Sequence, residues 1–245
     1  MSGMIYKAGA GAILQQIRLE TYANNLANVN TSGFKADQPV FRFEAPEIAS
    51  DSGDNAARLS PYALPLEYVT NFEAGPVRET GGPMDLAIVG KGFFEVQTPD
   101  GPQYTRNGRL SINADGMLST AEGLPIMGQG GEISIDGSRI EISEEGEVVV
   151  DGDIVGVLKV VDFNDPSRLK KVGNSLFTAD NAETGLVSAE GYRIAQGALE
   201  ASNVDAIRTM TEIIETLRVF ETYQKVIRSA DEATAKTVNE VGIPA

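Results

Sequence analysis

ANNLANVNTSGFK, residues 23–35, is the stretch that decides how this chain is organised. Four of its residues are asparagines, namely Asn24, Asn25, Asn28 and Asn30. Asparagine is a poor helix former because its amide competes for backbone hydrogen bonds. The same amide donates and accepts at once, which suits close contact with a neighbouring helix. The run therefore indicates a helix end whose role goes beyond forming a helix.

The residues after the asparagines predict how this helix ends. If Gly33 takes the left-handed conformation, Phe34 and Val29 would make the apolar contact of a Schellman cap. An ordinary capped helix end is the alternative for Gly33 and Phe34 taken alone. The candidate assembly motif consists of Asn24, Asn25, Leu26, Ala27, Asn28, Asn30, Thr31, Gly33 and Phe34.

Upstream of the motif, residues 4–32 show the pattern of an amphipathic helix. Apolar residues recur every seven positions, which is typical of a coiled-coil seam. Two internal glycines, Gly9 and Gly11, each lower helix stability by about 1 kcal/mol relative to alanine. The seam residues are Ile5, Ala12, Leu19 and Leu26.

The middle of the chain has a different pattern. Prolines and turn residues dominate residues 36–74, which predicts an extended connector. Short apolar strands separated by Asp-Gly pairs follow over residues 75–195, which favours an antiparallel all-β domain. We predict four parts: an N-terminal axial helix over 1–35, a connector over 36–74, a β-rich domain over 75–201 and a C-terminal axial helix over 202–245.

The C-terminal helix carries a second heptad seam. Ser202-Asn203-Val204-Asp205 resembles a capping box and predicts its start. Because the only other predicted helix is the N-terminal one, we expect the two to pair as a coiled coil. The predicted fold class is thus α+β, with an antiparallel β domain inserted between paired helices. The seam residues are Met210, Ile213, Leu217, Phe220, Gln224 and Ile227.

Composition excludes several functions. The net charge is −15, from 20 basic and 35 acidic residues, which argues against nucleic acid and against anionic membranes. The absence of histidine and cysteine removes the commonest general base and disulfides. The acidic run over 144–153 lacks the ligand spacing of a calcium loop. We therefore expect no catalytic site, no cofactor, no metal, no cleaved secretory signal and no membrane insertion.

Three blocks of sequence resemble one known family. The first is the asparagine-rich stretch, and the last is the pair Gln196-Gly197-Ala198-Leu199-Glu200 and Ser202-Asn203-Val204-Asp205. The central block comprises Gly75-Pro76, Thr80-Gly81-Gly82-Pro83-Met84-Asp85-Leu86-Ala87-Ile88, Gly92-Phe93-Phe94 and Tyr104-Thr105-Arg106. In this order the blocks are similar to those of the flagellar rod and hook family, the axial proteins of the bacterial flagellum.

The resemblance implies a non-enzymatic structural subunit of the basal-body rod. Its implied partners are other rod subunits, copies of itself and the flagellar type III export apparatus. Its implied location is the periplasmic rod, reached without a cleaved signal. The opening over 15–21 and the long last helix favour a proximal-rod member over a distal-rod or hook-type one. A different class remains open, namely a secreted β-rich glycan- or calcium-binding module with oligomerising helical tails.

Overall fold

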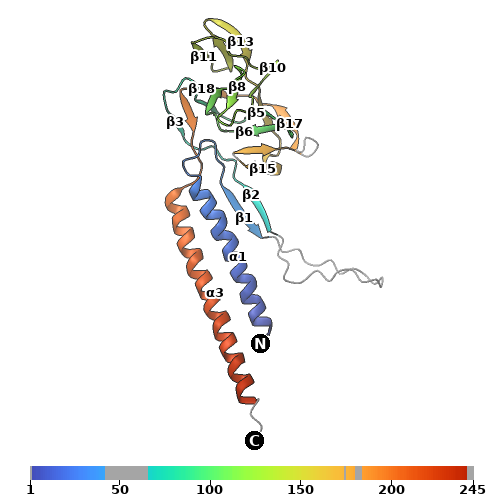
Figure 1. The fold of residues 1–245 in the computed structure, drawn as a ribbon, viewed down its shortest axis with the longest axis vertical. Coiled ribbons are helices and arrows are strands. Elements are labelled where there is room, and N and C mark those ends of the chain that lie inside the picture. Colours follow the sequence, from blue (N-terminus) through green and yellow to red (C-terminus); the bar gives the residue numbers. More distant parts are fainter. Residues whose placement is uncertain (1, 42–65, 174, 180–183, 242–245) are drawn as a thin grey trace, which may run out of the picture. The chain divides into compact units, whose positions relative to one another are not determined.

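The computed structural model describes residues 2–41, 66–173, 175–179 and 184–241, and the chain forms two compact units. The first unit holds the two terminal helices and a β-hairpin. The second unit, called the β unit below, holds the described residues of Asn28–Ala36 and Thr70–Val204. Figure 1 shows the elements of both.

The first unit is built on helices α1 (Ser2–Ala27) and α3 (Ala206–Val241), which lie side by side and antiparallel (Figure 1). Gly11 faces the ring of Tyr223, while Tyr22 and Glu212 line one groove nearer the other end. Paired terminal helices with an antiparallel β region between them confirm the predicted α+β class. Because α3 has 36 residues and α1 has 26, α3 is about 15 Å longer at 1.5 Å per residue.

The start of α3 differs from the predicted capping box. The Asp205 carboxylate accepts hydrogen bonds from the N–H groups of Ile207 and Arg208, at 3.0 and 3.1 Å. Asp205 therefore caps the helix, as a short acidic side chain does at this position. The Ser202 hydroxyl instead accepts from the N–H of Val204 in the segment before the helix.

A two-stranded hairpin, β1 (Asp37–Phe41) and β2 (Leu66–Thr70), completes the first unit. It falls within the predicted connector. Residues 42–65 of that connector, with most of its prolines, lie outside the described residues.

The β unit is centred on a six-stranded sheet in the order β15-β16-β6-β5-β14-β17, whose pairings are antiparallel. The β unit also contains a three-stranded sheet, β11-β12-β13, and the two-stranded sheets β4-β18, β3-β19, β7-β8 and β9-β10. A short 3-10 helix, η1 (Pro166–Arg168), precedes β15. The strands are β3 (Val77–Glu79), β4 (Leu86–Val89), β5 (Phe93–Thr98), β6 (Gly101–Thr105), β7 (Leu110–Ile112), β8 (Leu118–Thr120), β9 (Met127–Gly128), β10 (Gly131–Glu132), β11 (Ile140–Ile142), β12 (Glu147–Val150), β13 (Asp153–Val157), β14 (Val160–Phe163), β15 (Lys170–Gly173), β16 (Leu176–Thr178), β17 (Leu186–Ser188), β18 (Arg193–Gln196) and β19 (Ala198–Glu200).

Strand β5 separates two hydrophobic clusters because its side chains alternate between its faces. Phe94 and Val96 belong to a large aliphatic cluster, and both are fully buried. Phe93 belongs to an aromatic cluster with Tyr104 and Phe163, whose rings meet edge to face at 4.9 Å. Two clusters on opposite faces of one strand give the β unit a core that does not depend on the helices.

The two glycines of α1 differ in their surroundings, which leads to a first prediction. A Cβ on Gly9 would meet nothing within 4 Å, whereas one on Gly11 would lie 2.5 Å from the Tyr223 ring. We expect Gly9→Ala to raise the stability of the helix pair by up to about 1 kcal/mol through helix propensity. Gly11→Ala should gain less or lose stability, because the ring must move. Thermal loss of the far-UV helical signal measures both, and equal gains would contradict the close approach.

Candidate functional site

The candidate assembly motif does not form a single capped helix end. Helix α1 stops in the middle of it, and residues 28–33 form turns. The N–H of Phe34 donates to the carbonyl of Thr31 at 3.3 Å, and the N–H of Gly33 donates to the carbonyl of Glu200 at 2.8 Å. The predicted Schellman cap is therefore wrong, because neither N–H returns to the last helical turn. The asparagines end the helix earlier than the apolar pattern suggests.

Gly33 does take the predicted left-handed conformation, with φ of +67°. Its backbone also lies against another segment of the β unit. A Cβ at this position would overlap the backbone of Arg106 and Asn107. Glycine is thus required at this position for two reasons: its positive φ, and the close approach of another chain segment.

Asn25 uses its amide within the subunit. Its Nδ2 donates to the carbonyl of Asp37 at 2.8 Å, and its Oδ1 accepts from the N–H of Asp37 at 3.0 Å. The side chain is buried, so this pair of bonds fastens the start of β1 to α1. The Asn28 side chain likewise accepts from the hydroxyl of Thr31. Leu26 is half-buried, and the exposed members of the motif are Asn24, Ala27 and Asn30.

Directly after the motif, three charged side chains meet inside the β unit; we call Lys35, Arg106 and Glu200 the buried junction. The Lys35 ammonium lies 2.6 Å from one carboxylate oxygen of Glu200, and Arg106 lies 3.2 Å from the other. Lys35 and Glu200 each keep only 1% of their side-chain surface exposed. Such burial is tolerated only when the charges are paired and hydrogen-bonded.

Backbone groups also bind the buried junction, although the Nε of Arg106 is buried without a hydrogen-bond partner. The N–H of Gly75 donates to the Glu200 carboxylate at 2.9 Å, and Lys35 donates to the carbonyl of Glu73 at 2.7 Å. Arg106 donates to the carbonyls of Ile88 and Gly90. Its guanidinium also lies 5.3 Å from the centre of the Phe93 ring.

The electrostatics of the buried junction depend on one carboxylate. Burial lowers the pKa of Lys35 and of Arg106, because desolvation disfavours their charged forms. The charge of Glu200 opposes both shifts. The Glu200 carboxylate thus pairs with both cations and favours their charged forms, and the Asp162 charge has a smaller effect of the same sign on Arg106.

The same region holds together the ends of the chain segments that belong to the β unit. The N–H of Ala36 donates to the Asn203 side chain at 2.8 Å, and that side chain donates to the carbonyl of Asn71 at 2.8 Å. Lys171 donates to the carbonyl of Lys35 at 2.7 Å. Hydrogen bonds therefore hold three segments together, namely residues 33–36, 71–75 and 200–203.

The C-terminal seam follows a different register from the one predicted. The half-buried members are Ile213, Phe220, Gln224 and Ile227. Met210 and Leu217 are exposed, at 50% and 40%, so they do not pack against α1, and their role as seam residues toward neighbouring subunits stays a prediction. The heptad that faces α1 instead consists of Thr209, Ile213, Thr216, Phe220, Tyr223, Ile227 and Ala230, which are all buried or half-buried.

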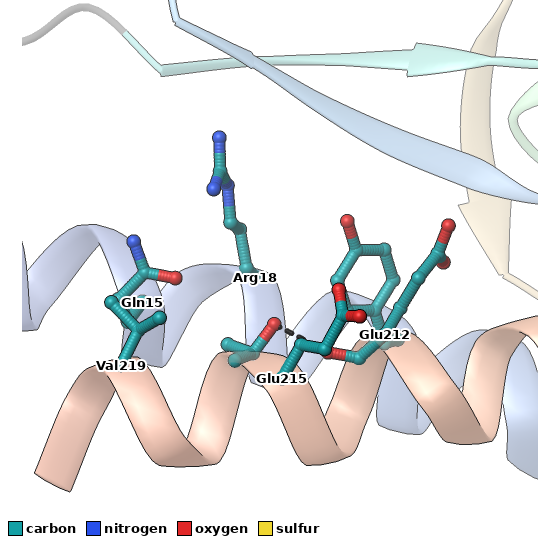
Figure 2. Close-up of a pocket in the computed structure, with 7 residues that line it drawn as sticks. Gln15, Arg18, Glu212, Glu215 and Val219 are labelled. Carbon is teal, nitrogen blue, oxygen red and sulfur yellow. Dashed lines mark hydrogen bonds between the residues drawn. The ribbon is translucent and has the colours of Figure 1, made fainter.

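A polar groove of about 170 Å³ runs between the helices. Figure 2 shows Gln15 and Arg18 from α1 beside Glu212, Glu215 and Val219 from α3. Burial raises the pKa of Tyr22 in this groove, and the charge of Glu212 adds to the effect. The lining mixes both signs of charge and holds no arrangement of nucleophile and base.

The described residues contain no group of three acidic side chains placed to hold a metal ion. Neither α1 nor α3, over the residues that the structure describes, is long and apolar enough to cross a membrane. The features that remain are surfaces and junctions between segments.

Comparisons with known proteins agree with this arrangement. Three family models match: "Flagella basal body rod protein" over residues 5–35, "Flagellar hook protein FlgE/F/G D1 domain" over 87–150 and "Flagellar basal body rod FlgEFG protein C-terminal" over 195–240. The flagellar basal-body rod protein FlgF of Caulobacter vibrioides is 33% identical over 99% of both chains. The chain belongs to the flagellar basal-body rod protein family.

Other relatives at full length carry related names. The flagellar hook-basal body complex protein FlhO of Bacillus subtilis is 33% identical over 97% of this chain and 98% of its own. The flagellar basal-body rod protein FlgG of Agrobacterium fabrum is 32% identical over 92% of this chain and 94% of its own. The predicted family is thus confirmed, and the chain is a structural, non-enzymatic subunit of the flagellar rod that assembles with other rod subunits.

Each of the three matched regions of this rod protein contributes one member of the buried junction. Lys35 closes the first match, Arg106 lies in the second and Glu200 lies in the third. All three residues lie in the family-like blocks of the sequence, but none of them was predicted as a site residue. The available signal was a charged residue at the end of a block, as Lys35 is in residues 23–35.

Proposed function

We propose that this chain is a proximal-rod subunit of the FlgF type, and that its helix pair packs against the terminal helices of neighbouring axial subunits. Support for the FlgF type comes from full-length relatives named FlgF at 33%, 29% and 28% identity, each covering at least 97% of both chains. Relatives named FlgG reach similar identity but cover slightly less, 92–96% of this chain.

The observation that carries the packing proposal is an exposed apolar line on α3, which we call the outer stripe. Its members recur at spacings of three and four, so they share one side of the helix. They lie beside the residues of α3 that face α1, and α1 does not cover them. The outer stripe consists of Ile207, Met210, Ile214 and Leu217, with exposures of 80%, 50%, 53% and 40%.

Exposed apolar residues in a line of this length mark a partner surface in a soluble protein. Helix α1 has its own exposed apolar residues, Tyr6 and Ile13, seven positions apart. Two different surfaces on one subunit permit head-to-tail contacts between neighbours. Contacts of that kind extend into an open helical assembly instead of closing into a dimer, as a rod requires.

A double substitution, Ile214→Ser with Leu217→Ser, tests the packing proposal. Both side chains point away from α1, so thermal unfolding of the purified subunit should change little. Incorporation into isolated hook–basal bodies should fall at least tenfold, measured by immunoblot against a constant basal-body protein. Export should continue, which we expect to occur through the flagellar type III apparatus to the periplasmic rod without cleavage of a signal.

Val226→Ser is the matched control, because Val226 is 39% exposed yet lies about two and a half turns from Leu217, on the opposite side of the helix. The control should be incorporated normally. Normal incorporation of the double variant would refute the outer stripe as an intersubunit surface.

The second candidate within the family is a distal-rod or hook-type role, supported by the FlgG and FlhO relatives. Basal bodies from mutants blocked at successive stages of rod growth separate the two. A proximal-rod subunit should be present in mutants that lack the distal rod, and a distal-rod subunit should be absent from them. The binding-module reading of the sequence predicts that removal of residues 1–35 leaves glycan or calcium binding intact.

A further inference from the structure

We propose that Glu200 is a positioning residue that fixes two of the segments through which the chain passes into or out of the β unit. The two segments are residues 33–36, which include the end of the assembly motif, and residues 200–203, which precede α3. This role concerns the β unit alone and does not depend on which rod protein the chain is.

Glu200 contacts three separate parts of the chain. Its carboxylate accepts from Lys35, from Arg106 and from the N–H of Gly75, while its main-chain carbonyl accepts from the N–H of Gly33. The three groups that bind the carboxylate lie in different segments, at Lys35, Gly75 and Arg106. One carboxylate therefore joins the incoming segment, the segment before β3 and the end of β6.

The charges in the buried junction make its three members unequal. Removing the Glu200 charge removes the carboxylate that forms an ion pair with both buried cations, and leaves Arg106 with only the smaller effect of the Asp162 charge. Removing the Lys35 charge leaves a neutral pair of Arg106 and Glu200. Truncating one partner of a buried pair is strongly destabilising because it leaves an uncompensated buried charge, which loss of Glu200 does and loss of Lys35 does not.

The clusters that form the core are made by other residues. Neither the aliphatic cluster around Phe94 nor the aromatic cluster contains a member of the buried junction, although Arg106 donates to the carbonyl of Ile88 in the first and lies over the Phe93 ring in the second. Loss of the Glu200 charge should thus release the entry and exit segments while the sheet around β5 and β6 stays folded.

Amide hydrogen exchange of the full chain tests this role. In Glu200→Gln we expect the N–H groups of Gly33, Ala36 and Gly75 to exchange at least about 100-fold faster, the scale of breaking one side of a buried ion pair. Amides within β5 and β6 should keep their exchange rates within about threefold. Lys35→Met should change all of these rates by less than about tenfold.

Combining the two changes separates positioning by charge from a general contribution to packing. Lys35→Met should restore part of the protection lost in Glu200→Gln, because one of the two unpaired cations is gone. Glu95→Gln is the matched control: Glu95 is also buried, but its partner Lys159 is 40% exposed and can hydrate when the charge is lost. This control should leave the exchange of Gly33 and Gly75 unchanged.

Three results would overturn the role of Glu200. They are an unchanged rate at Gly33 and Gly75, an equal rise across β5 and β6 that signals global unfolding, and an effect of Lys35→Met as large as that of Glu200→Gln. Assembly into rods plays no part in the measurement, so its outcome is independent of the packing proposal.

Discussion

Replacing Gly33 by alanine should lower the free energy of unfolding of the β unit by more than about 3 kcal/mol. The added methyl group would overlap the backbone of Arg106 and Asn107, and backbone cannot move aside as a side-chain tip can. The substitution also places a Cβ at φ of +67°. Denaturant titration of the full chain, followed by tyrosine fluorescence, measures the loss.

Gly81→Ala is the control for the dihedral strain alone. Gly81 has φ of +72°, but a Cβ there would meet nothing within 4 Å. It should therefore lose only about 1 to 2 kcal/mol. If both variants lose the same free energy of unfolding, the close approach of Gly33 to residues 106–107 contributes nothing to the loss.

Phe220→Ala should destabilise the helix pair by about 2 kcal/mol. The Phe220 side chain is half-buried in the heptad that faces α1, so its truncation loses less than the 3–5 kcal/mol typical of a core aromatic residue. We expect the far-UV helical signal to melt earlier, and incorporation into rods to fall as a consequence.

Leu217→Ala provides the contrast on the same helix. Leu217 lies on the outer stripe, so the melting of the free subunit should shift by less than about 0.5 kcal/mol, while incorporation should still decrease. A loss of monomer stability equal to that of Phe220→Ala would show that both side chains pack against α1.

Local patterns in the sequence were sufficient to predict the architecture. Heptad spacing predicted a helix at each end, and Asp-Gly turns between short apolar runs predicted the antiparallel β region. The absence of a third helical partner predicted that the ends pair, and the structure confirms this. Each of these features is periodic or local, so it can be recognised in the sequence without knowledge of distant contacts.

The register of the C-terminal seam was beyond such patterns. Met210 and Leu217 are more apolar than Thr209 and Thr216, and both pairs keep the spacing of three and four, so hydrophobicity favoured Met210 and Leu217. In the structure Thr209 and Thr216 are buried, and the larger residues remain exposed on the outer stripe. Burial against the partner helix, which the sequence does not show, distinguishes two stripes that lie about one residue apart.

The buried junction was decided by tertiary structure alone. The sequence by itself determined that Gly33 turns the chain and that Lys35, Arg106 and Glu200 stand in three distant blocks. It carried no sign that the three charges meet, because a pairing between residues 35 and 200 has no period and no fixed spacing. Only the folded β unit brings them within 3.2 Å and removes them from water, and burial is what makes that pairing obligatory.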